Sequence, residues 1–514
     1  MRRRRWFALV GAIGLVGALG TMLPAASSDK KAGSTASLTW AACPADVVIT
    51  VPVQVQCAKV PVPLDYRKPD GTQIELLISR IASPKPDKRR GVLLLNPGGP
   101  GGTGLNQGAF LISRGMPTSV SDAYDLIGMD TRGVGHSSSV GCGLTPGEAY
   151  WGNVPPYPAD DAAVLERTKI VKEVAERCAA NDKDGRLRHV TTANMARDLD
   201  RIRIALGEKK ASFYGASYGT ALGSAYTSLF PDTTDRVVLD SNLGDTYLSQ
   251  SGMRQYGVGF EETFGDFANW AAARHDVYGL GRTPAQVRET YFRVAERLDK
   301  TPLPTGGDGA QFRFLTFFGL YSQNSYGTTA RYWQEFMNPA AAPAPTAPET
   351  MAPTAPATTT PSAPATPAPT SPHDNALSVF LAVTCNDFDW PEDVETYRRA
   401  VAEDRKRLPM FGAAGANITP CAYWKYEPSE PPVKINDEGP ANVLILQNRR
   451  DPVTPLVGGK LLREKFEKRS ALVTVDASGH GVYFTGDNAC ALGITTKYLV
   501  EGEFPAKDVT CARN

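Results

Sequence analysis

The sequence predicts an α/β protein in which a mainly parallel β-sheet is wrapped by helices. The first observation is that short apolar runs typical of strands alternate with segments of helical periodicity. The second is a G-x-S-x-G turn between a strand-like run and a helix-like run. The third is size, because 514 residues with 42% hydrophobic and 21% charged residues can bury a large globular core.

The N-terminus, residues 1–27, is expected to be a signal peptide. Four arginines at positions 2–5 precede the apolar run 7–23, and small residues at 24–28 suit cleavage. An uncleaved membrane anchor is the alternative, because the run is only just shorter than the roughly 18 residues typical of an anchor. The arginines leave the choice between Sec and twin-arginine export open. We therefore expect an exported protein, either secreted or associated with the cell wall.

The charge balance gives no reason to expect nucleic-acid binding. The chain has 55 Lys+Arg and 54 Asp+Glu, a formal net charge of +1, and loss of the four arginines at positions 2–5 takes it to −3. A nearly neutral, slightly acidic protein has no general attraction to phosphate backbones. We also expect no stable membrane insertion once the signal peptide is removed, and the oligomeric state stays open.

Eight cysteines fit an exported protein with disulfides. Their number is even, the sequence has no CxxC pair, and no histidines lie close enough to suggest a zinc site. Buried free thiols are the alternative. Because neighbours along the chain close the shortest loops, the favoured pairs are Cys43–Cys57, Cys142–Cys178, Cys385–Cys421 and Cys490–Cys511.

Residues 339–372 form a low-complexity insert of Pro, Ala, Thr and Ser. Its eleven prolines fit neither a helix interior nor a sheet, so we expect an extended, solvated segment. It is either a loop without function or a spacer that is glycosylated or spans the cell wall.

Six apolar runs are expected to be strands of the sheet core. Between the second and third runs, apolar residues recur at spacings of four, three and four from Met195 to Leu206, which predicts a helix over 194–206. Open α/β sheets place their chemistry at the carboxyl ends of strands, so the residues after each run matter most. The predicted strands are residues 92–95, 124–129, 211–214, 237–239, 443–446 and 472–475.

The third predicted strand leads into Gly215-Ala216-Ser217-Tyr218-Gly219 and then a helical segment. Small residues allow a sharp strand-to-helix turn, which presents the Ser217 hydroxyl at the helix N-terminus, where developing negative charge is favoured. Ser217 is therefore the predicted nucleophile. An ordinary glycine-rich turn is the alternative.

A nucleophilic serine needs a general base, and elimination among the five histidines points to His480. His480 follows the last predicted strand in the turn 477–481, although it could instead be a histidine of a surface loop. Of the others, His373 lies at the edge of the insert, while His136, His189 and His275 fall outside the order Ser, acid, His.

The third member of the triad should be a carboxylate that orients the imidazole and stabilises its protonated form. Asp451 follows the fifth predicted strand and fits this role. Asp476 is the alternative, but it lies only four residues before His480 on the same strand exit.

The glycine-rich segment 96–104 directly follows the first predicted strand. Its backbone amides can approach an oxyanion, and we favour Gly99 as one donor, with Gly98 nearly as suitable, and the amide of Tyr218 as the other. A phosphate-binding loop is disfavoured, because the segment lacks both the Gly-Lys-Ser/Thr ending and the G-x-G-x-x-G order.

Five ordered motifs, from about residue 40 to the C-terminus, carry a family resemblance. They resemble the exported tripeptidyl aminopeptidases of the α/β-hydrolase fold, relatives of the prolyl aminopeptidases. The low-complexity insert departs from that pattern. The motifs are NPGGPGGTG (96–104), DLIGMDTRGVGHS (125–137), GASYGT (215–220), DPVTP (451–455) and SGHG (478–481).

The resemblance implies a serine exopeptidase that removes short peptides, tripeptides in particular, from free N-termini. It also implies that Ser217, Asp451 and His480 form the triad, that the 96–104 loop contributes to the oxyanion hole, and that no metal or cofactor takes part. Related sequences include exported esterases, so a carboxylesterase with the same triad is the first alternative. A catalytically silent cell-wall binding protein is the second.

The family's helical cap, inserted between the two parts of the hydrolase core, is expected over residues 248–377, including the insert. The core parts are then 28–247 and 378–514. A free peptide N-terminus is a cation, and burying it requires a carboxylate partner. The candidates, for each of which a solvated surface acid is the alternative, are Asp387, Asp389, Glu261 and Glu262.

Overall fold

The computed structural model describes residues 38–245, 248–304, 306–338, 370–483 and 488–513. The predicted signal peptide and residues 339–369 of the insert lie outside these ranges. No helix within them is both long enough and apolar enough to cross a lipid bilayer.

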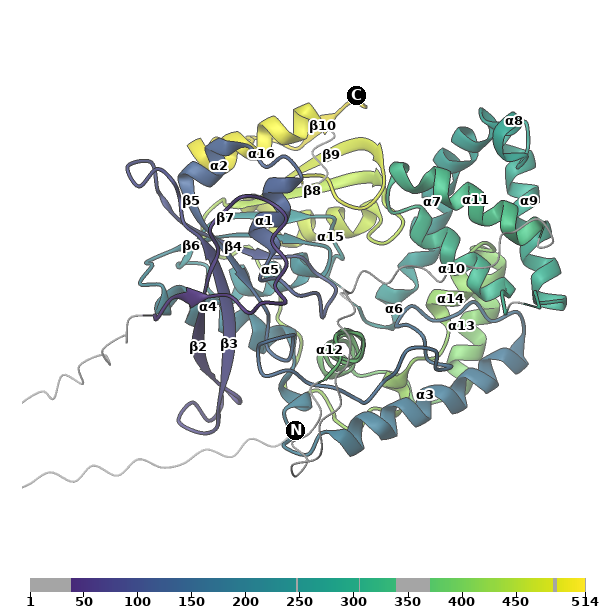
Figure 1. Ribbon diagram of the computed structural model, residues 1–514, viewed down its shortest axis with the longest axis horizontal. Coiled ribbons are helices and arrows are strands. Elements are labelled where there is room, and N and C mark those ends of the chain that lie inside the picture. The colour runs from purple at the N-terminus through teal and green to yellow at the C-terminus, as the bar shows by residue number, and fades with distance from the viewer. Residues whose placement is uncertain (1–37, 246–247, 305, 339–369, 484–487, 514) are drawn as a thin grey trace, which may run out of the picture. The chain divides into compact units, whose positions relative to one another are not determined.

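Ten strands of the described chain form one sheet in the order β1-β2-β3-β5-β4-β6-β7-β8-β9-β10 (Figure 1). The pairs β1–β2, β2–β3 and β3–β5 are antiparallel, and all other neighbours are parallel, which confirms the mainly parallel α/β fold. The strands are β1 (Ala41–Ala42), β2 (Gln56–Pro63), β3 (Gln73–Ile81), β4 (Gly91–Asn96), β5 (Tyr124–Met129), β6 (Ala211–Ala216), β7 (Thr234–Asp240), β8 (Val443–Arg450), β9 (Ser470–Ser478) and β10 (Val509–Cys511).

The six predicted runs lie in β4 to β9. Every residue of β4, β5 and β6 is buried, as expected for parallel strands that are covered on both faces. Strand β2 was not predicted, and its two prolines, Pro61 and Pro63, explain why, because proline is a signal against a strand.

Helices cover both faces of the sheet, and the alternation of side chains along β4 shows how. Leu93 and Leu95 pack in a cluster with α1, α2 and α16, whereas Val92 and Leu94 pack in another with α4, α5 and α15 (Figure 1). Apolar side chains of the long helix α3 belong to the same cluster as Val92 and Leu94. These helices are α1 (Gln107–Ser113), α2 (Thr118–Ala123), α3 (Asp161–Asn181), α4 (Thr192–Ala205), α5 (Tyr218–Leu229), α15 (Leu456–Phe466) and α16 (Ala489–Glu501); short 3-10 turns are η1 (Leu187–His189) and η5 (Glu467–Arg469).

A helical segment separates β7 from β8 (Figure 1). Two of its helices, α7 and α9, pack through aromatic side chains such as Phe264 and Tyr291, whose ring centroids lie 5.6 Å apart. The expected boundary at residue 377 falls inside α12, which begins at the Ser371 N-cap and continues without a break to Asp387. The segment contains α6 (Gln250–Met253), α7 (Gln255–Ala272), α8 (His275–Tyr278), α9 (Pro284–Lys300), α10 (Gly309–Gly319), η2 (Gln323–Ser325), α11 (Tyr326–Met337), α12 (Pro372–Asp387), α13 (Val394–Arg407), α14 (Gly412–Ala416) and η4 (Pro420–Tyr423).

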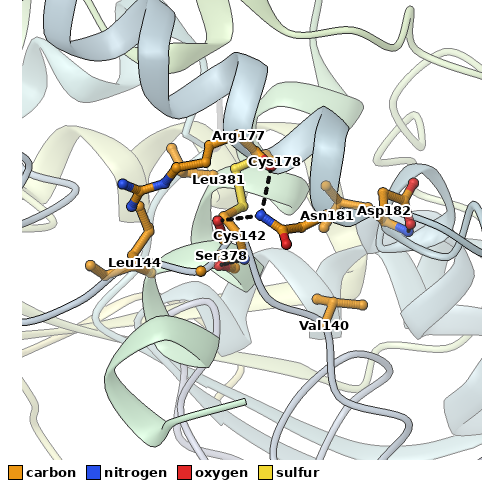
Figure 2. Close-up of a disulfide and its surroundings, with 12 residues drawn as sticks. Val140, Cys142, Leu144, Arg177, Cys178, Asn181, Asp182, Ser378 and Leu381 are labelled. Atoms are coloured by element: carbon orange, nitrogen blue, oxygen red, sulfur yellow. Dashed lines mark hydrogen bonds between the residues drawn. A yellow bond between two sulfur atoms is a disulfide. The ribbon is translucent and has the colours of Figure 1, made fainter. Parts of the chain in front are cut away.

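The eight cysteines are joined in the four pairs that short loops favour: Cys43–Cys57, Cys142–Cys178, Cys385–Cys421 and Cys490–Cys511. The second bond ties the loop after β5 to α3 (Figure 2). Beside it, Asn181 Nδ2 donates hydrogen bonds to the Cys142 and Arg177 carbonyl oxygens, both at 2.9 Å. The disulfides therefore fasten loops and helices around the sheet.

Candidate active site

Ser217 lies in a tight turn between β6 and α5. Its φ of +57° and ψ of −123° form a conformation that costs a non-glycine residue about 1–3 kcal/mol. A Cβ at Gly215 would lie 2.3 Å from the Gly219 carbonyl oxygen, and one at Gly219 would lie 2.8 Å from that of Asn96. Both glycines are therefore required for the turn that presents Ser217 at the N-terminus of α5.

His480 follows β9, Asp451 follows β8, and their side chains are hydrogen-bonded. His480 Nδ1 lies 2.9 Å from Asp451 Oδ2 and 3.1 Å from Oδ1. The fully buried Asp451 carboxylate also accepts hydrogen bonds from the Val453 amide (2.9 Å), the Thr454 amide (3.0 Å) and the Thr454 hydroxyl (2.8 Å). These contacts hold Nδ1 on the carboxylate side, so Nε2 is the nitrogen that can exchange a proton with a substrate or nucleophile.

The environment of His480 stabilises its protonated form. Burial alone would lower the pKa of His480, but the charge and hydrogen bond of Asp451 outweigh burial and raise it. The buried Asp240 acts in the same direction. Asp476, the alternative acid, instead pairs with Arg450 at 2.8 Å, and its side chain is 40% exposed. The carboxylate beside His480 is therefore Asp451.

The loop that carries His480 is held by Asp240 and Ser241, which sequence reasoning missed. Asp240 is the last residue of β7, and Ser241 follows it directly. Ser241 Oγ accepts a hydrogen bond from the amide of residue 481, and the Asp240 carboxylate accepts bonds from the amides of 482 and 483, all at 2.8 Å. Three successive amides after His480 are thereby anchored to a neighbouring strand. The sequence did contain a signal for Asp240, because this acid directly follows the predicted strand 237–239, at the edge where α/β sheets place their functional residues.

Tyr321, just after α10, also contacts the histidine. The His480 amide donates to the Tyr321 carbonyl oxygen at 2.8 Å, and the two rings meet edge-to-face with centroids 5.4 Å apart. Gly479 has φ +117°, and a Cβ there would lie 2.8 Å from the same carbonyl oxygen. The helical segment between β7 and β8 therefore contacts the catalytic edge of the sheet directly.

The glycine-rich loop after β4 lies against the turn at Ser217. A Cβ at Gly98 would lie 2.5 Å from the Ala216 carbonyl oxygen and 3.1 Å from the Tyr218 amide nitrogen, so only glycine permits this approach. The Gly98 amide donates to Asn96 Oδ1 at 3.0 Å and is already engaged. Gly99, in contrast, lines the same cavity as Ser217. This geometry favours Gly99 over Gly98 as an oxyanion donor.

Ser217 and His480 both line one cavity of about 430 Å³. Its size suits a small or medium ligand. No carboxylate or lysine lies among the described residues that line it. Its walls are mainly apolar and include Leu243, Leu248, Phe314, Phe318, Leu377 and Phe380.

The four carboxylates expected to bind a substrate amine lie outside this lining. Glu261 pairs with Arg288 at 3.0 Å and accepts a bond from the Met410 amide, whereas Glu262 and Asp389 are exposed. Asp387 accepts bonds from the Thr192 amide (2.9 Å) and hydroxyl (2.5 Å), and burial raises its pKa to about 7. These contacts give Glu261 and Asp387 structural partners, and the binding of a substrate amine by any of the four carboxylates stays a prediction.

Comparison with known proteins identifies the family. Residues 408–511 match the family model described as TAP-like protein. The tripeptidyl aminopeptidase of Streptomyces coelicolor is 35% identical over an alignment that covers 93% of this chain and 86% of that protein. The chain belongs to the tripeptidyl aminopeptidase family. The sequence-based resemblance is thus confirmed, and the chain is a serine hydrolase.

Two further relatives show the range of the family. The serine protease Hip1 of Mycobacterium tuberculosis is 27% identical over 98% of this chain and 95% of its own length. A protein named carboxylesterase B, from the same organism, is 27% identical over 92% of this chain and 90% of its own length. Proteins named as peptidases and as an esterase therefore align with this chain over nearly its whole length.

Proposed function

We propose that this protein is a serine exopeptidase that releases short peptides, tripeptides in particular, from free N-termini. The observation that carries the proposal is that His480, hydrogen-bonded to Asp451, lines the same apolar cavity as the strained Ser217. The 35% identity to a tripeptidyl aminopeptidase supports this substrate class. A silent binding protein is disfavoured, because it has no need for all three groups together.

In the proposed reaction, His480 Nε2 takes the proton of Ser217 Oγ as the oxygen forms a bond to the scissile carbonyl carbon. The amides of Gly99 and Tyr218 stabilise the negative charge on the carbonyl oxygen. His480 then gives its proton to the leaving amine as the C–N bond breaks. His480 next takes a proton from water as the water oxygen bonds to the acyl carbon, and it returns that proton to Ser217 Oγ as the acyl C–O bond breaks, which frees the N-terminal peptide and Ser217.

We also propose that the helices between β7 and β8 act as the cap over Ser217. Two observations support this role. Tyr321 contacts His480, and the cavity of Ser217 is lined by side chains of this segment, namely Phe314, Phe318, Leu377 and Phe380. Cleavage after a signal peptide and an extracellular location complete the proposal. The four disulfides support this location, because such bonds persist in oxidising compartments.

A carboxylesterase is the second candidate. The apolar cavity, with no carboxylate among its described lining residues, suits an uncharged acyl group, and the relative named carboxylesterase B aligns with 92% of this chain. Esters and peptides require the same triad chemistry, so the substrate distinguishes the two candidates.

The deciding experiment is mass analysis of the products that the purified mature protein releases from unblocked peptides, from N-acetylated copies of them and from simple esters. The exopeptidase proposal expects successive tripeptides from unblocked peptides and much slower release from acetylated ones. Equal rates on acetylated and unblocked peptides would contradict it. Turnover of esters without any peptide cleavage would establish the carboxylesterase instead.

A further inference from the structure

Four aromatic rings form a continuous row that starts beside His480; we call it the aromatic strip. Tyr321 meets the His480 ring edge-to-face. Phe318 stacks on Tyr321 at 5.1 Å between centroids, Phe314 lies 4.5 Å from Phe318, and Trp151 lies 4.3 Å from Phe314. Two rings thus come from α10, one follows it, and Trp151 comes from the loop between β5 and α3.

The outer part of the strip is open to solvent. Phe318 is 39% exposed and Trp151 is 36% exposed, although both are large and apolar. Phe314, Phe318 and Tyr321 also line the cavity of Ser217. Exposed aromatic rings that adjoin one another at the edge of a cavity mark a binding surface, because water contact with them is unfavourable and a ligand relieves it.

The described lining of the cavity beside the strip contains no carboxylate, lysine or arginine to pair with a charged side chain. The remaining walls include Leu243, Leu248, Leu377 and Phe380. The side chain of Asn153 is already engaged, since its Oδ1 accepts a bond from the Tyr150 hydroxyl and its Nδ2 donates to the Leu377 carbonyl oxygen. A buried acidic or basic substrate side chain would therefore remain unpaired, which is costly.

We propose that the aromatic strip and the apolar walls of the cavity bind apolar side chains of the acyl part of the substrate and discriminate against acidic and basic residues next to the scissile bond. This inference rests on the proposed exopeptidase function. In an exopeptidase the short acyl part must fit within a bounded space, whereas the rest of the peptide extends into solvent.

The first arm of the test compares tripeptidyl p-nitroanilides Ala-Ala-Xaa with free N-termini, in which Xaa is Leu, Phe, Asp or Lys. The Leu and Phe substrates should exceed the Asp and Lys substrates in kcat/KM by about 100-fold, given that even small changes in an apolar pocket alter this ratio by about 10- to 200-fold. Equal kcat/KM across the series overturns the inference but leaves the exopeptidase proposal standing. No release from any member, together with turnover of p-nitrophenyl esters, overturns the exopeptidase proposal itself.

The second arm uses variants of the strip. Phe318→Ala and Phe314→Ala should raise KM for the Ala-Ala-Leu substrate about tenfold with a smaller change in kcat, and should narrow the preference for Leu over Asp. Tyr332→Ala is the matched control, because Tyr332 is a 37% exposed aromatic residue on α11 that lies outside the strip and the cavity lining. Phe318 is exposed, so its variant should fold like the control. If Phe318→Ala and Tyr332→Ala show the same KM and the same preference, the strip does not select the substrate.

Discussion

At the scale of single residues, the environment of each polar group determines its chemistry. Ser217 occupies a left-handed backbone conformation that only the glycines on either side of it permit. Asp451 accepts four hydrogen bonds in a fully buried position, which fixes it against His480. Asp476, only a few residues from His480 along the chain, pairs with Arg450 instead. The carboxylate that contacts His480 is therefore not the one nearest in sequence, but the one at the end of the neighbouring strand β8.

The first prediction concerns Ser217→Ala. The change removes the nucleophile but keeps a small side chain in the turn, so the fold should survive. We expect kcat to fall on the order of 10⁶-fold, the loss found when the triad serine of another serine hydrolase is removed. Steady-state kinetics with a chromogenic substrate measures the loss, and a circular dichroism spectrum like that of the wild type verifies the fold. Near-normal turnover would exclude Ser217 as the nucleophile.

The second prediction compares Asp451→Asn with Asp476→Asn. The first should lower kcat by about 10⁴-fold, because an amide disturbs the tautomer and orientation of His480. It should also lower the pKa of His480, which Asp451 raises, and so move the acid limb of the kcat/KM profile to lower pH. This direction follows because His480 must be neutral to accept a proton. Asp476→Asn, which disturbs only the contact with Arg450, should leave the pH profile close to that of the wild type.

At the scale of elements, loops at the carboxyl ends of four parallel strands build the site. The loop after β4 supplies Gly99, the turn after β6 supplies Ser217, and the loops after β8 and β9 supply Asp451 and His480. The end of β7 supplies no triad member but anchors the amides after His480. Neighbouring parallel strands end at the same edge, which is why residues more than 200 positions apart meet.

The third prediction tests this anchor with Asp240→Asn. An asparagine has one acceptor oxygen, so it loses the bond to one of the two amides that the carboxylate now holds. A resulting displacement of His480 by about 1 Å should lower kcat roughly 100-fold with little change in KM. Asp235→Asn, at the opposite end of β7, is the control and should retain wild-type kinetics. Should the Asp240 variant fail to fold, Ser241→Ala provides the same kinetic test, because it removes the acceptor for the amide of residue 481 together with the bond that the Ser241 hydroxyl donates to Asp240.

At the scale of the whole molecule, three of the four disulfides join segments that the sheet itself does not connect. Cys142–Cys178 closes a loop between β5 and α3, and Cys490–Cys511 joins α16 to β10. A cross-link of this kind mainly restricts the unfolded chain and contributes about 2–4 kcal/mol to stability. The bonds therefore contribute to the stability of the fold and not to the chemistry at Ser217.

The fourth prediction is that replacing both Cys142 and Cys178 with alanine lowers the free energy of unfolding by about 2–4 kcal/mol. At low temperature the variant should retain the kcat and KM of the wild type, because neither cysteine lines the cavity of Ser217. Chemical denaturation followed by fluorescence measures the stability. Exposed surface substitutions typically change stability by no more than about 0.5 kcal/mol, and a change that small would show that the bond is dispensable.

The sequence by itself determined the parts of this protein that depend on local patterns. The apolar runs predicted β4 to β9, because parallel strands buried on both faces consist of almost continuous apolar residues. The glycines around Ser217 predicted the turn, since few other residues permit its backbone. The order of the motifs and the small number of histidines then indicated Ser217, Asp451 and His480 together.

Only the tertiary structure decided what depends on contacts between distant segments. It separated Asp451 from Asp476, paired Glu261 with Arg288 and Asp387 with Thr192, and brought Asp240 under the histidine loop. A carboxylate has the same local sequence signal whether it binds a substrate, an arginine or a backbone amide. Its partner is set by which strand ends and helices the fold brings together, and that is a property of packing across hundreds of residues.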